Sequence, residues 1–267
     1  MIKVAFIQFA PVLDDLNTTI NNLEPLIKNV SNANLVVLPE LANSGYNFKN
    51  KEQAFKTAES TESGIFTNFL IEKCKQHNFH IVSGINEIEN GKLFNSAILV
   101  NSDGCIGKYR KIHLFLNEKK YFHYGNELPV FDLGFCKIGI LICFDHLFPE
   151  PWRILALKGA QIICHPSNLV TNLSFKTLPA HALMNKIFII TANRIGCEEG
   201  LTFTGKSRII DPLGERICQA SVNKKETTII EIDPNKADDK IVNSMNHIFK
   251  DRKLKVYTKY LNGFGGL

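Results

Sequence analysis

The sequence lacks several patterns that mark large classes of protein. No apolar run approaches the roughly 20 residues of a membrane-spanning helix. Residues 1–8 bring in polar side chains before the apolar core of a signal peptide could form. The 7 cysteines are an odd number, with no CxxC pair and no Cys/His spacing typical of zinc. We therefore expect a cytoplasmic protein with free thiols, no membrane partner and no metal.

A clustered basic surface is also missing. The net charge is +5, but the 31 Lys and Arg residues are scattered among 26 Asp and Glu residues. The densest basic cluster, residues 108–111, is short. Binding to nucleic acid needs a basic stripe or patch, so we expect no nucleic-acid partner.

The chain does contain short apolar runs that alternate with helical patterns. Residues 4–7 and 35–38 are rich in β-branched side chains and predict buried strands, whereas apolar residues at helical spacing predict a helix over 16–30. This alternation favours an α/β layered domain. Further strands are predicted at 79–85, 138–142, 161–164 and 188–191, further helices at 64–78, 149–158 and 178–185, and a hairpin from 94–100 with 105–109, so the sheets should be mixed.

The C-terminal part reads differently from the rest. The last clear strand pattern is residues 228–232, and the charged stretch 235–259 follows it. This stretch is either a mobile tail or an arm that packs on a partner. We expect one domain over residues 1–240 and a C-terminal arm over residues 241–267.

Cys143 is a candidate nucleophile because of its position. It follows an apolar strand and precedes a turn that leads into a helix. Such a strand–turn–helix geometry presents a side chain at the carboxyl end of a sheet, where ligands of open α/β sheets bind. Helix N-terminal amides nearby can favour a thiolate and supply oxyanion donors. The alternative is that Cys143 is a small core residue.

Glu40 and Lys111 are candidates on weaker grounds. Glu40 also ends an apolar strand, where a carboxylate must be paired, hydrated or shifted in pKa; the alternative is an acid in an exposed loop. Lys111 ends a basic cluster and directly precedes an apolar run, so it is the member of the cluster best placed to point inward. The alternative is a solvated face.

Taken together, three segments resemble the nitrilase superfamily of carbon–nitrogen hydrolases. They are LPEL at 38–41 with GY at 45–46, GKYRKIHLF at 107–115, and ICFD at 142–145. The resemblance runs in family order over nearly the whole chain. Further matches are HPSNL at 165–169, TANR at 191–194 and GKSRIIDPLGE at 205–215.

The resemblance implies a four-layer αββα sandwich of two mixed sheets flanked by helices. It also implies a Glu40–Lys111–Cys143 site, with Glu118 as a second glutamate. Residues 246–252 resemble an arm that crosses to a partner, which implies a homodimer or larger assembly. The sequence HALMN at 181–185 stands where many members have an Arg-Ala-Leu-Glu-Asn helix, so the local salt bridge of that helix is in question.

These residue types suit the hydrolysis of an amide. A thiolate of Cys143 attacks the amide carbon, and Glu40 takes the thiol proton and passes it to the leaving nitrogen. Lys111 and the backbone N–H of Phe144 stabilise the oxyanion. Glu118 orients the substrate or keeps Lys111 charged. No metal or organic cofactor is expected, and the substrate is a small-molecule amide.

Other readings of the sequence remain. Cys164 and His165 could form a papain-like pair, but neighbours on a strand point to opposite faces. Asn168 is either a substrate contact or a plain loop residue. Phe144-Asp145 replaces the Trp-Glu common in nitrilases proper, which favours amides over nitriles, although Asp145 could simply cap the turn. The alternatives are a true nitrilase, an N-carbamoyl-amino-acid hydrolase, or a catalytically silent member that acts through binding.

Overall fold

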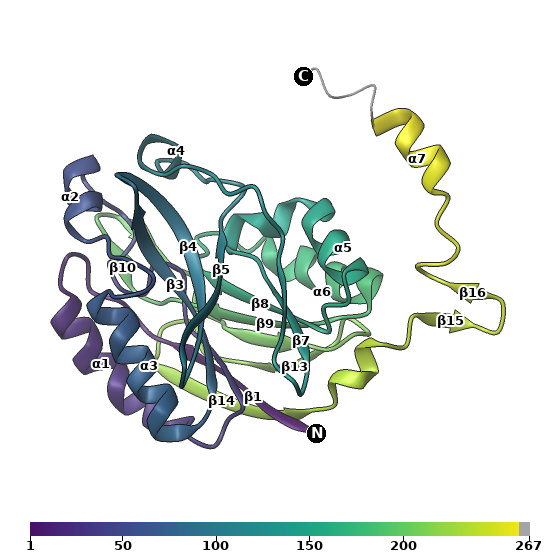
Figure 1. Ribbon diagram of the computed structural model, residues 1–267, viewed down its shortest axis with the longest axis horizontal. Helices are drawn as coiled ribbons and strands as arrows, with labels where there is room; N and C mark the ends of the chain where they lie inside the picture. Colours follow the sequence, from purple (N-terminus) through teal and green to yellow (C-terminus); the bar gives the residue numbers. More distant parts are fainter. Residues whose placement is uncertain (262–267) are drawn as a thin grey trace.

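The computed structural model describes residues 1–261 and shows two sheets packed face to face between two layers of helices (Figure 1). The last residues of the expected arm, 262–267, lie outside the described residues. The first sheet has the strand order β14-β1-β2-β3-β4-β5. Its strands are β1 (Ile2–Gln8), β2 (Leu35–Val37), β3 (His80–Glu89), β4 (Lys92–Asn101), β5 (Gly104–Arg110) and β14 (Glu226–Ile232).

The second sheet has the order β13-β12-β9-β8-β7-β6. Strands β7, β8 and β9 are parallel to one another, β6 and β12 are antiparallel to them, and the edge strand β13 is antiparallel to β12. In the first sheet β1 is antiparallel to β14 and parallel to β2, so both sheets are mixed as expected. The strands of the second sheet are β6 (Val130–Asp132), β7 (Lys137–Ile140), β8 (Ile162–Ser167), β9 (Phe188–Asn193), β12 (Arg208–Ile210) and β13 (Arg216–Gln219); the short pair β10 (Cys197–Glu198) and β11 (Leu201–Thr202) lies apart from both sheets.

Helices cover the outer face of each sheet. Helices α1 (Leu16–Asn29) and α3 (Ile65–His77) pack on the first sheet, and α5 (Pro149–Leu157) and α6 (Ser174–Asn185) pack on the second. The shorter α2 (Lys51–Lys56) and α4 (Glu118–Tyr121) lie in loops. The predicted four-layer αββα sandwich is therefore confirmed.

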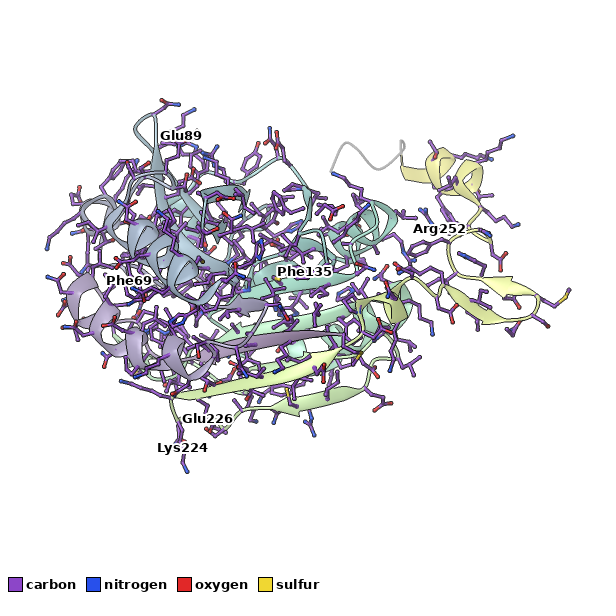
Figure 2. The ribbon with its side chains drawn as sticks, turned by 60° about the horizontal axis from the view of Figure 1, so that its bottom comes forward. Phe69, Glu89, Phe135, Lys224, Glu226 and Arg252 are labelled. Carbon is purple, nitrogen blue, oxygen red and sulfur yellow. The ribbon has the colours of Figure 1, made fainter. Side chains whose placement is uncertain are left out.

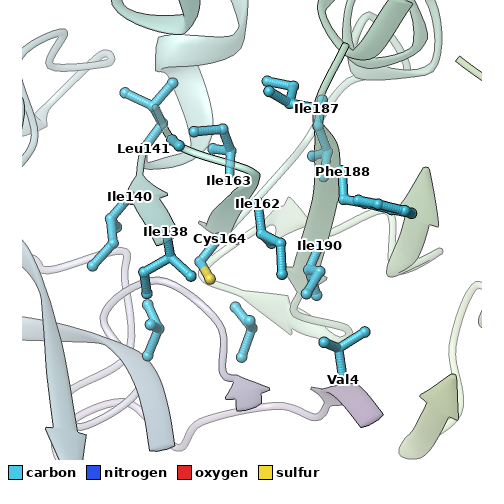
Figure 3. Close-up of a cluster of buried hydrophobic side chains, with 14 of the residues drawn as sticks. Val4, Ile138, Ile140, Leu141, Ile162, Ile163, Cys164, Ile187, Phe188 and Ile190 are labelled. Atoms are coloured by element: carbon cyan, nitrogen blue, oxygen red, sulfur yellow. The ribbon is translucent and has the colours of Figure 1, made fainter. Parts of the chain in front are cut away.

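The layers explain why the strands are apolar throughout. In β1, Val4 and Phe6 belong to the core between the two sheets, whereas Ala5 and Ile7 belong to the core under α1 and α3. A strand buried on both faces needs apolar residues at every position. Figure 3 shows the core between the sheets, with the sulfur of Cys164 among isoleucine side chains from β7, β8 and β9.

One predicted strand is shorter than expected, and the difference concerns the site. We expected a strand over 138–142, but β7 ends at Ile140. The N–H of Ile142 donates to Asp145 Oδ2 at 2.8 Å instead of to a neighbouring strand. The chain therefore leaves the sheet just before Cys143.

The C-terminal segment leaves the body of the molecule (Figure 1). After the 3₁₀ helix η2 (Pro234–Ala237) come β15 (Ile241–Asn243), β16 (Asn246–His247) and α7 (Leu254–Leu261). Figure 2 shows Arg252 on this segment, well outside the sandwich. Among residues 1–261, no helix has the length and apolar character needed to cross a membrane. Apolar side chains on the segment are exposed: Ile241, Val242, Met245, Leu254, Val256, Tyr257 and Tyr260.

Candidate active site

Cys143 lies at the first position of the 3₁₀ helix η1 (Cys143–Leu147), directly beyond β7. Its φ is +42°, a left-handed conformation that a non-glycine residue adopts only where the surroundings hold it. The residue is 5% exposed. The strand–turn–helix geometry expected from the sequence is therefore present, and it forms a strained turn.

Asp145 holds this turn in place. Its Oδ2 accepts the Ile142 N–H at 2.8 Å and the Tyr109 hydroxyl at 2.8 Å, and its Oδ1 lies 2.7 Å from His113 Nδ1. The indole N–H of Trp152 donates to the Asp145 carbonyl at 3.0 Å. Asp145 thus caps the turn, the structural role that the sequence left open for it.

Glu40 and Lys111 form a fully buried ion pair. Lys111 Nζ lies 2.6 Å from Glu40 Oε1, and both side chains are 0% exposed. Asn95 Nδ2 also donates to Glu40 Oε1, at 2.7 Å. Gly84 of β3 permits this loop to approach, because a Cβ there would stand 2.4 Å from the Cα of Glu40.

Glu118 completes a group of three charged side chains. Its Oε1 accepts from Lys111 Nζ at 2.9 Å and from the Tyr46 hydroxyl at 2.7 Å. Its Oε2 accepts the Phe115 N–H at 3.2 Å. The N–H of Tyr46 in turn donates to Glu198 Oε2 at 2.9 Å, which fixes the loop that carries the phenol.

The pKa shifts follow from burial and from these neighbours. Burial alone would lower the pKa of Lys111, but the carboxylates of Glu118 and Glu40 outweigh it and raise that pKa, so the ammonium stays charged. Burial raises the pKa of Glu118, although Lys111 opposes the shift. Burial and the nearby Glu40 also raise the pKa of the Cys143 thiol well above its usual value. The resting thiol is therefore neutral and needs a base to become a nucleophile.

A cavity of about 60 Å³ lies over Cys143. Asn168 lines it, and its Nδ2 donates to the Glu40 carbonyl at 3.0 Å. Its backbone N–H slightly lowers the pKa of the Cys143 thiol, against the larger effect of burial. The remaining lining is mostly apolar: Phe115, Phe144, His146, Leu147, Leu169, Val170, Thr171 and Leu173.

The structure brings all six candidates into one site: Glu40, Lys111, Glu118 and Cys143 around the buried ion pair, and Phe144 and Asn168 in the cavity wall. Cys164, in contrast, packs in the core between the sheets (Figure 3). Sequence reasoning assigned no role to Tyr46 or to Asn95. Asn95 carries a detectable signal, because it and Ser96 are polar residues between apolar runs inside β4.

The fold and this site define a carbon–nitrogen hydrolase of the nitrilase superfamily, and comparison with known proteins agrees. The family model described as "Carbon-nitrogen hydrolase" matches residues 3–240, so the chain belongs to this family. It is 45% identical over 260 residues to a protein of Pyrococcus abyssi described as "Nitrilase", covering 96% of this chain and 99% of that protein. It is 28% identical to a tomato N-carbamoylputrescine amidase, covering 96% and 94%.

Solved structures are similar in fold. A structure of an amidase from Nesterenkonia, a member of the nitrilase superfamily, matches with a TM-score of 0.80 at 22% identity and covers 97% of each chain. A protein of Schizosaccharomyces pombe described as "Probable nitrilase" is 31% identical over 97% of this chain and 98% of its own length. The protein is thus an enzyme that hydrolyses carbon–nitrogen bonds other than peptide bonds.

Proposed function

We propose that the protein hydrolyses a small carboxamide to a carboxylic acid and ammonia through a thioester on Cys143. One observation carries the proposal: a neutral, buried thiol lies beside Glu40, which is bonded to the ammonium of Lys111. This arrangement supplies a nucleophile, a base and a fixed positive charge within one buried site.

The reaction divides into two halves. Glu40 takes the proton from Cys143 as the sulfur attacks the amide carbon, and Lys111 with the Phe144 N–H stabilises the oxyanion. The carbon–nitrogen bond breaks as the protonated Glu40 returns the proton to nitrogen, and ammonia leaves a thioester. Glu40 then takes a proton from water, whose oxygen attacks the thioester, and it returns this proton to the sulfur as the carbon–sulfur bond breaks, which releases the acid and the thiol. Glu118 keeps Lys111 in position through their 2.9 Å contact.

The cavity favours a short, uncharged acyl group. A water molecule needs about 10–15 Å³ on the same measure, so 60 Å³ accepts roughly four to six water-sized groups. His146 is the lining residue that could carry charge, and burial lowers its pKa to about 4, so it is neutral near pH 7. Amides that also carry an amine or a carboxylate therefore find no counter-charge among the residues that line this cavity. An amidase of Nesterenkonia, solved with butyramide, supports the same size class.

A true nitrilase is the second candidate, because the relative with 45% identity is described as one. Both substrate types begin with attack by sulfur, but a nitrile gives a thioimidate that must add water before ammonia leaves. Asp145 is fully committed to capping the turn, so it offers no acid for that step. An N-carbamoyl-amino-acid substrate would bring a carboxylate that the cavity wall leaves unpaired.

The experiment compares kcat/KM for matched amides and nitriles of the same carbon skeleton, such as butyramide and butyronitrile. We expect the amide to be preferred. A consistent preference of tenfold or more for nitriles, equivalent to about 1.4 kcal/mol in transition-state binding, would promote the second candidate. Absence of ammonia from both panels would favour a binding protein without catalysis. Mass spectrometry of the trapped acyl-enzyme identifies the modified cysteine.

We also propose that the chain forms a cytoplasmic homodimer in which residues 241–267 act as an arm. Strand β15 and helix α7 lie on a segment that extends away from the sandwich, and several of their apolar side chains are exposed (Figure 2). A second copy of the same chain would bury them. All seven cysteines are free, which suits a reducing compartment.

A further inference from the structure

Two buried histidines form hydrogen bonds with backbone carbonyls of the 3₁₀ helix η1, which begins with Cys143. His165 of β8 places Nε2 at 3.0 Å from the Cys143 carbonyl oxygen. His181 of α6 places Nε2 at 3.0 Å from the His146 carbonyl oxygen. Both histidines are buried, at 0% and 5% exposure. Cys143 and His146 belong to the same short 3₁₀ helix, so each end of the turn has its own imidazole donor.

The chemistry of these partners fixes the tautomer of His165. A carbonyl oxygen only accepts hydrogen bonds, so the proton of the imidazole must lie on Nε2. Burial lowers the pKa of His165 well below its usual value, and a neutral imidazole carries one N–H. Its Nδ1 is then an acceptor, and two hydroxyls stand in reach, Ser167 Oγ at 3.1 Å and Thr191 Oγ1 at 3.2 Å.

The bond to the Cys143 carbonyl also determines where the Phe144 N–H points. The two groups belong to one planar trans peptide, so they point in opposite directions. Holding the carbonyl against His165 turns the N–H to the other side of the turn. Within residues 1–261, this N–H donates to no protein acceptor. It is left available for the oxyanion that the proposed mechanism assigns to it.

The turn needs such a restraint because its conformation is strained. Cys143 has φ +42°, and a flipped peptide would place the carbonyl where the N–H should be. An oxyanion beside a carbonyl oxygen would be repelled instead of stabilised. The His165 N–H, by binding the Cys143 carbonyl, favours the peptide orientation that leaves the Phe144 N–H free for the oxyanion before substrate binds.

We propose that His165 is a positioning residue that presets the oxyanion donor, the Phe144 N–H, by binding the Cys143 carbonyl. The proposal rests on the proposed function, because it assumes an oxyanion formed by attack of Cys143. His165 does not exchange a proton with the thiol, since its Nε2–H is engaged with the carbonyl. The neighbours Cys164 and His165 point to opposite faces of β8. The Cys164 sulfur packs in the core between the sheets, whereas the His165 imidazole binds the backbone of the active site.

The test compares His165→Met with His165→Gln. The two side chains are close in length and volume, but Gln can donate to the Cys143 carbonyl and Met cannot. For a small amide we expect His165→Met to lower kcat by about 10²-fold, the usual cost of an oxyanion donor, with KM within about threefold. His165→Gln should recover at least tenfold of that loss. His181→Phe, which removes the bond to the other end of the turn, should keep kcat within about threefold.

A second readout separates positioning from general distortion. Iodoacetamide alkylates Cys143 by displacing iodide from a saturated carbon, which forms no oxyanion. We expect its rate with His165→Met to stay within about threefold of the unmodified enzyme. An alkylation rate that falls in parallel with kcat would overturn the proposal, as would an unchanged kcat in His165→Met or an equal loss in His181→Phe.

The outcome is distinguishable from failure of the proposed function. If Cys143→Ala keeps turnover, Cys143 is not the nucleophile and the oxyanion argument has no basis. If Cys143→Ala is inactive while His165→Met keeps normal activity, only the positioning role of His165 is wrong. Should His165→Met fail to fold, His165→Leu, which likewise has no donor for the Cys143 carbonyl, answers the same question. We expect its kcat to fall at least tenfold; an unchanged kcat there overturns the proposal.

Discussion

Glu40 and Glu118 bind the same ammonium group, with their Oε1 atoms 2.6 Å and 2.9 Å from Lys111 Nζ. Burial raises the pKa of Glu118, and the nearby Glu40 adds to the rise, although the Lys111 ammonium opposes it. Lys111 is held from two sides, so its charge stays where an oxyanion can use it.

We expect Cys143→Ala to abolish turnover and leave the fold intact, because the thiol is the only atom lost from the turn. Cys164→Ala is the matched control: that sulfur lies in the core between the sheets, so its loss should lower stability by about 1–2 kcal/mol and spare kcat. Ammonia release and urea unfolding measure the two effects. Activity that survives in Cys143→Ala but disappears in Cys164→Ala would show that the nucleophile is misassigned.

Glu40→Gln and Lys111→Met should each reduce kcat by at least about 10³, and the double variant should lose little more, because residues that act as a unit give non-additive losses. Steady-state kinetics with one amide tests this. Glu87→Gln is the control, since Glu87 is also buried and paired, with Lys108 at 2.7 Å, but belongs to a separate ion network. Near-normal kcat in either site variant would remove that residue from the mechanism.

Tyr46→Phe removes the hydroxyl that donates to Glu118 Oε1 at 2.7 Å. A carboxylate that loses a donor becomes harder to ionise, so the pKa of Glu118 should rise further. We expect the acidic limb of the kcat/KM–pH profile to move to higher pH and kcat to fall by about tenfold. Tyr121→Phe, whose hydroxyl donates to the Phe48 carbonyl, should leave the profile unchanged. A profile that does not move in Tyr46→Phe would mean that Glu118 ionisation does not limit the reaction.

His146 should make the protein less stable in mild acid. Burial lowers its pKa to about 4 in the folded chain, whereas the unfolded chain titrates near 6.5. Between these pH values the unfolded state binds more protons than the folded state. The contribution of His146 to the free energy of unfolding is therefore complete above pH 6.5 and is lost as the pH falls toward 4. From pH 7.5 to pH 5.0 this amounts to about 2 kcal/mol.

Urea unfolding at the two pH values, for the unmodified chain and His146→Gln, isolates this contribution. The drop in unfolding free energy should be smaller in the variant by about 2 kcal/mol. Equal drops in both proteins would show that His146 has an ordinary pKa. The buried His165 and His181 are retained in both proteins.

The C-terminal segment should hold two chains together. We expect light scattering at micromolar concentration to give twice the chain mass of 30.1 kDa. Val242→Asp with Val256→Asp should lower that mass, because both side chains are exposed and apolar on β15 and α7. Leu213→Asp, an equally exposed site on the body, should not change it. A monomer for the unmodified chain contradicts the homodimer.

The sequence predicted most of the layers because strands buried on both faces are locally recognisable. Continuous apolar runs such as 4–7 and 35–38 coincide with β1 and β2, and the helical spacing over 16–30 coincides with α1 (Leu16–Asn29). Where a local contact changed the backbone, prediction was less accurate. The strand expected over 138–142 stops at Ile140 because the Asp145 carboxylate binds the Ile142 N–H.

The site divides in the same way. Motifs in the sequence identified Glu40, Lys111, Glu118 and Cys143, since residue type and order along the chain carry that information. Only the tertiary structure decided which atoms meet: that Tyr46 donates to Glu118, that Cys143 has a positive φ, and that His165 binds the carbonyl of Cys143 and not its thiol. Periodicity describes each element separately, whereas these contacts join residues 22 to 72 positions apart and exist only once distant strands have assembled into one sheet.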